Sequence, residues 1–306
     1  MTRKPWSVLP ACVCLLLGTG VAAQDQGPEK VYKLLRDDAS AREELEIEEQ
    51  AAPAWQPGLK AGTVEVSISL GMLGLDKVLL AHDQMIYKYT TEYTYWGDVT
   101  LTGTAAFSPA LRLGYQVKDW VALEAIGGLS FSEYTSSIVN RHSRKNEIDA
   151  PIDEAEPPLG EYDTEARSLI TLQTGLNAVV YPLAWRGDGT GRWHPYLTAG
   201  AGRIWYDMNS DFTEGSVSSL DLNVGGGIRV LGDRNVSVRC EVLMHRNTLQ
   251  WNPATDFLEL NEGTTLVPLN EYPVQSDGSF DERPITSFNS LDMNSLSFSI
   301  GVQGTF

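Results

Sequence analysis

The last eleven residues alternate between apolar and small polar side chains. Leu296, Phe298, Ile300, Val302 and Phe306 share one parity, and the positions between them hold serine, glycine, glutamine and threonine. An alternation of period two is typical of a β-strand with one apolar face. A soluble sheet also has such a face, so this stretch alone does not separate a soluble sandwich from a membrane barrel.

Seven further segments repeat the alternation. In the first of them, Val64, Ile68 and Met72 lie at one parity, and Glu65 and Ser69 lie at the other. Each segment supplies at least the ~9–11 residues that a tilted strand needs to cross a bilayer. The eight predicted strands cover about 64–72, 107–117, 121–131, 170–180, 195–206, 220–230, 236–244 and 296–306.

The connections between these strands alternate in length. Short turns on one side and long loops on the other, with an even strand number, are typical of an outer-membrane barrel. A soluble sandwich has no reason to separate its loops in this way. The sequence therefore predicts an all-β fold, a closed antiparallel up-and-down transmembrane barrel of eight strands. The short connections are 118–120, 184–193 and 231–235, the long ones are about 76–99, 135–166 and 249–289, and 208–217 is brief.

Two stretches leave alternatives open. Residues 87–96 alternate aromatic and polar side chains. The preferred interpretation is a strand pair above the membrane; the alternatives, in order, are part of the interfacial aromatic girdle and an adhesive surface. Two further strands there would give a barrel of ten strands. The fifth predicted strand has an unclear parity, and Arg203 is assigned to its interior face because an arginine facing lipid is costly.

The N-terminus has the features of a signal peptide over residues 1–23. Arg3 and Lys4 precede an apolar stretch, and small residues at Val21 and Ala23 precede a cleavage position. The apolar stretch is well short of the ~20 residues of a spanning helix. Cleavage leaves Cys240 as the sole cysteine, which excludes an intramolecular disulfide.

The mature chain is expected to have two parts. Residues 24–61 are acidic and contain a breaker cluster of proline and glycine, so we expect a mostly disordered periplasmic leader, with a partner-binding helix as the alternative. Residues 62–306 hold all eight predicted strands and form the barrel.

The charge balance excludes one class of partner. The chain has 23 basic and 40 acidic residues, a net charge of −17, so it would repel the phosphates of nucleic acids. Many acidic side chains lie in 135–166 and 249–289. Carboxylates suit calcium or magnesium, but these have no fixed ligand spacing. A solvated acidic surface is the preferred interpretation, and no metal is expected.

Three stretches resemble a known family. Pro109–Phe131 is similar to the central hairpin of small outer-membrane barrels of the OmpA/OmpX type, and Pro195–Gly202 and the ending at Phe306 are similar to their later strands. The resemblance implies insertion from the periplasm with a periplasmic N-terminus, contact with outer-membrane lipid and lipopolysaccharide, a monomer, and no cofactor.

The resemblance also implies recognition by the barrel-assembly machinery. Ser299, Gly301 and Phe306 match the assembly signal of the family, and Gly304 stands where that signal has a hydrophobic residue.

Parity places six charged side chains in the barrel interior, in the half nearer the short turns. A barrel of eight strands has room only for side chains or one small ligand, and isolated buried charges are strongly unfavourable. We expect a neutral ion-pair network that plugs the lumen; a gated or proton-conducting lumen is the alternative. The turn at 118–120 places Arg112 diagonally across the strand pair from Glu124, within reach of its long side chain. Truncating either residue should destabilise the barrel and alter its heat-modifiable gel shift. The six residues are Glu65, Arg112, Glu124, Arg229, Arg239 and Glu241.

Asp221 and His245 are expected to face each other near the loop end of their strands. A histidine beside a carboxylate serves hydrolysis only with a nucleophilic serine next to it. The sequence places no such serine, since His142 and Ser143 fall in a predicted loop, so a hydrogen bond in the lumen is preferred and no enzyme is expected.

The expected function is a structural or cell-surface interaction role, with an unknown surface ligand. A small passive channel for apolar molecules, as in OmpW-type barrels, is the alternative. A lipid-modifying enzyme that depends on His245 is a third class.

Overall fold

The computed structural model describes residues 57–147, 152–153, 166–187, 191–258, 266–273, 279 and 281–306. The expected signal peptide and nearly all of the expected leader lie outside these residues. In the described part of the chain, no helix is long and apolar enough to cross a membrane.

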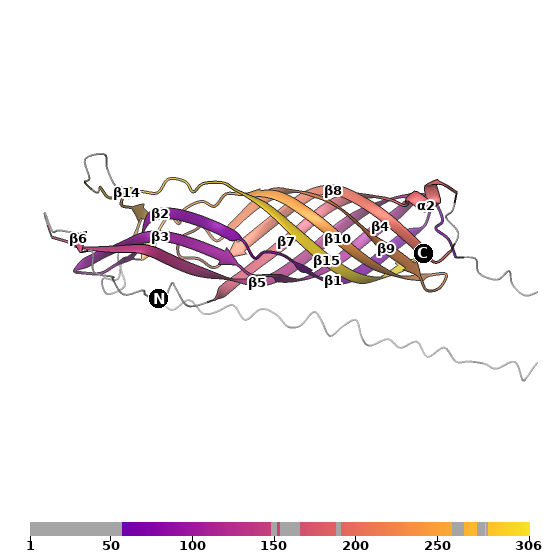
Figure 1. Ribbon diagram of the computed structural model, residues 1–306, viewed down its shortest axis with the longest axis horizontal. Helices are drawn as coiled ribbons and strands as arrows, with labels where there is room; N and C mark the ends of the chain where they lie inside the picture. Colours follow the sequence, from indigo (N-terminus) through magenta and orange to yellow (C-terminus); the bar gives the residue numbers. More distant parts are fainter. Residues whose placement is uncertain are drawn as a thin grey trace, which may run out of the picture. The chain divides into compact units, whose positions relative to one another are not determined.

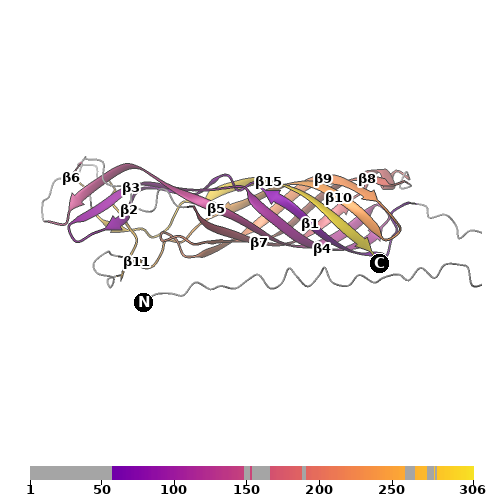
Figure 2. The ribbon, with the colours of Figure 1, turned by 90° about the horizontal axis from the view of Figure 1, so that it is seen from below.

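Eight strands of the described ranges pair in a closed antiparallel ring (Figures 1 and 2). β15 pairs back onto β1, so the ring has no free edge and each strand satisfies its backbone groups on both sides. This confirms the predicted fold and all eight predicted strands. In ring order they are β1 (Val64–Leu73), β4 (Ala106–Lys118), β5 (Val121–Lys145), β7 (Arg167–Val180), β8 (Trp193–Met208), β9 (Ser216–Leu231), β10 (Val236–Leu249) and β15 (Leu291–Thr305).

The outer face of the ring is apolar. In the β1–β15 pair, Ile68 lies opposite Val302 and Met72 opposite Phe298, and all four side chains are more than half exposed. A continuous apolar exterior of this extent is unfavourable in water and is typical of a barrel that sits in a bilayer. The barrel is therefore a membrane barrel. Exposed members on other strands include Leu113, Leu123, Leu176, Leu197, Leu222 and Val242.

Arg203 lies on the outer face, so its predicted interior position was wrong. In β8 the buried positions Tyr196, Ile204 and Tyr206 are all even-numbered, which turns every odd-numbered side chain outward. Arg203 pairs with Leu220 in the loop half of the strand. The cost of a lipid-facing arginine falls toward the interface, where its long side chain can reach the headgroups. The predicted interior position assumed the same cost for a lipid-facing arginine at every depth.

A hairpin extends the sheet beyond the ring. β2 (Val78–Tyr89) pairs with β3 (Tyr93–Gly103), and β3 pairs with residues 134–145 at the far end of β5. Figure 2 shows this hairpin at the end of the barrel opposite the C-terminus. The strand pair above the membrane is thus confirmed, and the ring closes with eight strands rather than ten. His142 and Ser143 lie in β5, not in a loop as predicted.

An apolar cluster fills the loop end of the barrel. It joins inward-facing barrel residues such as Leu169 and Tyr206 to the hairpin and to the connection between β10 and β15. Within it, the Trp251 indole donates a hydrogen bond to the Leu79 carbonyl over 3.1 Å, and the rings of Trp96 and Tyr272 lie 4.7 Å apart. We call this cluster the apolar dome.

Short strands hold the loops against the dome. β13 pairs with both β14 and β2, and Glu271 of β13 contacts His82 of β2 at 2.5 Å and Arg283 of β14 at 2.6 Å. The short strands are β6 (Ile152–Asp153), β11 (Phe257–Leu258), β12 (Leu266–Val267), β13 (Asn270–Glu271) and β14 (Arg283–Pro284).

The short-turn end holds a smaller cluster of buried apolar residues. Leu59 packs with Val179, Tyr181 and Tyr196 beside α2 (Pro182–Trp185), the short helix of the β7–β8 connection. Leu59 belongs to the last residues of the expected leader, so this part of it packs against the barrel.

Candidate functional site

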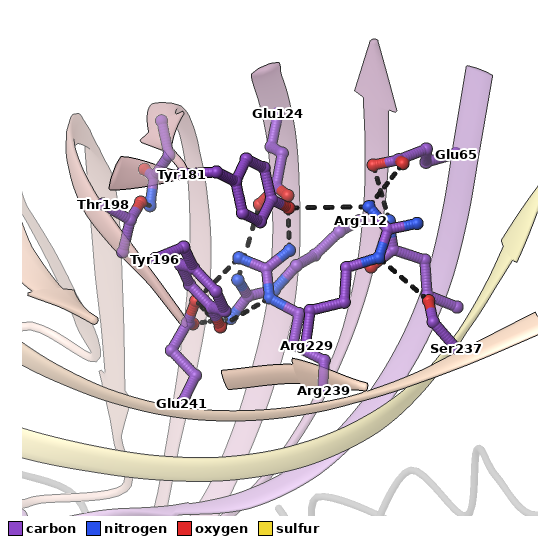
Figure 3. Close-up of polar contacts among 12 residues, drawn as sticks. Glu65, Arg112, Glu124, Tyr181, Tyr196, Thr198, Arg229, Ser237, Arg239 and Glu241 are labelled. Carbon is purple, nitrogen blue, oxygen red and sulfur yellow. Dashed lines mark hydrogen bonds and ion pairs between the residues drawn. The ribbon is translucent and has the colours of Figure 1, made fainter. Parts of the chain in front are cut away.

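The structure brings together all six charged side chains that parity places in the lumen. They project inward from β1, β4, β5, β9 and β10 (Figure 3), and none is more than 6% exposed. Three carboxylates face three guanidinium groups, so the set is neutral. We call it the ion-pair layer: Glu65, Arg112, Glu124, Arg229, Arg239 and Glu241.

Strand register explains why the carboxylates are needed. Arg229 and Arg239 are direct cross-strand partners in the β9–β10 pair, where like charges repel. Glu65 offsets Arg229 at 2.6 Å, and Glu124 and Glu241 both pair with Arg239, the latter at 2.8 Å. Each arginine thus has a carboxylate within the same low-dielectric interior, as buried charges require.

The β4–β5 turn sets the other diagonal. Gly114 pairs with Glu124, and Arg112 lies two residues before Gly114 in β4. The Nη1 atom of Arg112 is 3.6 Å from Oε2 of Glu124, and its Nη2 atom donates to Oε1 of Glu241. The diagonal relation predicted from residues 118–120 is therefore present.

Tyr196 is a member of the layer that the sequence did not reveal. Arg239 donates from Nε to its hydroxyl over 2.6 Å, and that hydroxyl donates to Oε2 of Glu241 over 2.9 Å. The Arg239 guanidinium carbon also lies 4.4 Å from the centre of the tyrosine ring. The unclear parity of the fifth predicted strand hid this residue, and only an even-position reading of β8 would have placed it inward.

Close backbone approach around Tyr196 requires glycine. A Cβ atom on Gly227 would lie 2.5 Å from the Tyr196 hydroxyl and 2.1 Å from the carbonyl of Cys240. A glycine at this position gives the ring and its two polar partners their space.

A small polar cavity lies next to the ion-pair layer, on its loop side. Its volume is about 40 Å³, enough for about two or three water molecules. We call it the polar chamber. Side chains that line it include Ser69, Arg112, Gln173, Asn223, His245 and Ser297.

Asp221 and His245 meet at the chamber, as their strand positions predicted. His245 Nδ1 lies 2.9 Å from Asp221 Oδ2, and both side chains are buried. Ser297 Oγ lies 3.0 Å from the other ring nitrogen, Nε2. The sequence did not place this serine, because the register of β15 on β10 is set across the long connection 249–289.

The tip of the molecule carries an open hollow of about 570 Å³, at the end of the hairpin. Glu282 accepts hydrogen bonds there from Tyr89 over 2.6 Å and from Asn270 over 2.5 Å. Burial, and then the neighbouring Glu282 carboxylate, raise the pKa of Tyr89 well above its ordinary value, so the phenol keeps its proton. Arg144 and Lys145 line the same hollow.

The acidic loops are described only in part. Most of their carboxylates lie outside the described residues. Among the residues that are described, no group of three or more His, Cys, Asp and Glu side chains is arranged to hold a metal ion.

The proposed assembly signal lies in β15 and at Phe306, the residue after it. Ser299 and Gly301 take inward positions, and Phe306 is 80% exposed at the short-turn end. A Cβ atom on Gly304 would lie 3.3 Å from the Phe306 ring. Recognition by an assembly machinery remains a prediction.

Comparison by sequence gives no match, whereas comparison of structures does. No protein-family model and no curated protein matches it. It is similar to the solved structures of the outer membrane protein OprG from Pseudomonas aeruginosa (11% identity, 81% of this chain, 98% of that chain, TM-score 0.45) and of Neisserial surface protein A (12%, 80%, 98%, 0.36). The N-terminal β-barrel domain of Pseudomonas aeruginosa OprF is also similar (15%, 80%, 98%, 0.30).

The identities and TM-scores of these structures are too low to carry a function to this chain. The fold assignment therefore rests on the strand pairings of the chain itself.

Proposed function

We propose that this chain is an integral outer-membrane protein whose barrel is a closed anchor and whose hairpin and loops act at the cell surface. The observation that carries the proposal is that the lumen is filled at two levels. The ion-pair layer occupies the short-turn half, and the apolar dome occupies the loop end.

The ion-pair layer supports a plug rather than a pore. A conducting lumen needs a continuous path of water or titratable groups, whereas here Arg229 is held by Glu65, Ser237 and Thr305. Gln303 also donates to Glu65 over 2.5 Å. Separating Arg229 from Glu65 leaves two buried charges unpaired, so the layer resists opening.

The surface role follows from what lies beyond the ring. The hairpin and the connection between β10 and β15 form a packed structure with its own apolar interior, which an anchor alone does not need. The hollow at its tip combines aromatic, acidic, amide and basic groups, a mixture suited to a polar surface ligand. In this orientation the short turns and the N-terminus lie in the periplasm, and the acidic loops face outward among lipopolysaccharide.

Conductance separates this proposal from a small passive channel. The full mature chain, reconstituted in planar bilayers, should give no discrete single-channel steps. Entry of an apolar dye into vesicles that contain the protein should match entry into empty vesicles. Channel steps or protein-dependent dye entry would contradict the closed barrel and favour the passive channel.

Orientation has its own test. Thr91 lies between β2 and β3 at the tip, and Asp233 lies in the turn between β9 and β10. In intact Gram-negative cells, a membrane-impermeant maleimide should label Thr91→Cys and spare Asp233→Cys, with Cys240→Ser as the common background. The reverse pattern would overturn the proposed topology.

A further inference from the structure

Three side chains at the polar chamber are joined in a row by two hydrogen-bond contacts. Ser297 of β15, His245 of β10 and Asp221 of β9 come from three neighbouring strands. The serine Oγ is 3.0 Å from Nε2 of the histidine, and Nδ1 of the histidine is 2.9 Å from Oδ2 of the aspartate. A nucleophile, a base and a group that orients the base are therefore within hydrogen-bond distance of each other.

The neighbours determine which ring nitrogen carries the proton. Gln173 donates from Nε2 to Oδ2 of Asp221 over 2.8 Å, and Asp221 is fully buried. The Gln173 amide nitrogen also lies 3.2 Å from Nδ1 of His245. An ionised carboxylate only accepts, so we assign the ring proton to Nδ1, which donates to Oδ2, and the Gln173 amide then donates to the carboxylate alone. Nε2 is then the acceptor for the Ser297 hydroxyl, which is the tautomer that removes a proton from a serine.

A further group at the chamber points to a ligand. Arg112 lines the chamber and is only 6% exposed. Among the described residues its Nε atom has no hydrogen-bond partner, and its Nη1 atom faces the Glu124 carboxylate at 3.6 Å without a hydrogen bond. Unsatisfied buried donors are costly. Donors at a small cavity in the barrel interior suit the negative oxygen that develops during acyl transfer.

The chamber also borders the lipid-facing seam between β1 and β15. Their ladder runs to Leu73 and Ser297, and Gly74 then donates a backbone hydrogen bond to the Leu296 carbonyl over 2.8 Å. Met72 and Phe298, which are outward positions of these strands, belong to the chamber lining. A volume of about 40 Å³ admits a carbonyl group but not an acyl chain, which would have to remain on the apolar side of the seam.

We propose that Ser297, His245 and Asp221 form a nucleophilic site that hydrolyses carboxylic esters of membrane lipids. This activity goes beyond the surface role. Ser297 Oγ bonds to the ester carbonyl carbon while its proton passes to Nε2 of His245, and Arg112 faces the oxyanion. The carbon–oxygen bond to the alcohol then breaks, and the alcohol leaves with that proton. Water attacks the acyl-serine through the same base and releases the carboxylic acid, which restores Ser297.

A covalent probe tests the nucleophile directly. The full mature chain in phosphatidylcholine vesicles, treated with diisopropyl fluorophosphate, should gain one adduct on the peptide that contains Ser297. Ser297→Ala should abolish the adduct, and His245→Ala should slow its formation at least about a hundredfold. Ser295→Ala is the matched control, because Ser295 is buried on the same face of β15 but outside the chamber lining. In this variant the adduct on Ser297 should form as in the natural chain.

Asp221→Asn keeps the size of the side chain but favours the His245 tautomer with the proton on Nε2, which cannot accept the serine proton. This variant should hydrolyse p-nitrophenyl butyrate about 10²–10⁴-fold more slowly. A retained heat-modifiable gel shift shows that each variant is folded. Absence of an adduct on the folded natural chain, or an adduct that persists in Ser297→Ala, would overturn the site. Equal hydrolysis by natural chain and Asp221→Asn would do the same.

Discussion

Arg239 has the most partners in the ion-pair layer. Its guanidinium group contacts Glu124 and Glu241, donates to Tyr196 and lies over the tyrosine ring. Removal of this side chain leaves two buried carboxylates with one arginine, Arg112, between them. The layer is therefore most sensitive at this residue.

Arg239→Ala should lower the free energy of unfolding by about 3–5 kcal/mol, because it leaves buried charge uncompensated. Urea titration in vesicles, followed by the heat-modifiable gel shift, measures the change. Arg246→Ala is the control, since Arg246 lies on the outer face of the same strand and should cost far less. Equal losses in the two variants would show that the layer contributes no specific stability.

Gly227→Ala should destabilise the barrel by about 1–3 kcal/mol, because the added methyl group must displace the Tyr196 hydroxyl or the strand backbone. The same urea titration checks it. Gly127→Ala is the control, because its added Cβ would meet no described atom within 4 Å. An unchanged midpoint for Gly227→Ala would mean that Tyr196 has room to move.

At the scale of elements, β2 and β3 depend on the dome as well as on the pairing of β3 with β5. Trp96 is fully buried, and its indole donates to Gln84 over 3.0 Å while its ring packs on Tyr272 of the β10–β15 connection. The hairpin and that connection thus share one apolar interior, and they should loosen together.

Trp96→Ala should increase the rate of proteolysis within 249–289 at least about tenfold while the barrel remains folded, because opening of the dome is local. Limited proteolysis with the gel shift as a folding control measures both. Trp193→Ala, at a 65% exposed position, should change neither. Loss of the gel shift in Trp96→Ala would show instead that the barrel and dome unfold as one unit.

At the scale of the whole molecule, the ion-pair layer and the apolar dome occupy two separate levels of the lumen, and both are closures in the proposed function. Leu73 and Ala106 are directly paired across β1 and β4, so a short linker can replace residues 76–103 without disturbing the ring. The shortened chain loses the hairpin but keeps the ion-pair layer.

This shortened chain should still show the heat-modifiable gel shift and should still give no channel steps in planar bilayers, because ring pairing and the ion-pair layer are intact. Channel activity would show that the dome alone closes the lumen. Failure to fold would show that the ring requires the hairpin.

The sequence alone determined the strands, their faces and the ring. Period-two alternation places every second side chain on the same face, so Glu65, Glu124 and Arg239 had to share the interior once the apolar face met lipid. The short turn at 118–120 even gave the diagonal of Arg112 and Glu124, because a tight turn sets register locally.

Only the tertiary structure decided the relations that cross long connections or depend on depth. The register of β15 on β10 spans 249–289, so no local rule could bring Ser297 to His245. Tyr196 and Arg203 lie on the faces opposite to those predicted, because the small residues of β8 do not show which of its faces is apolar. The pairing of β8 with β7 and β9 determines which residues face inward. Alternation fixes a face within one strand, whereas contact between strands requires a register that closing the ring imposes.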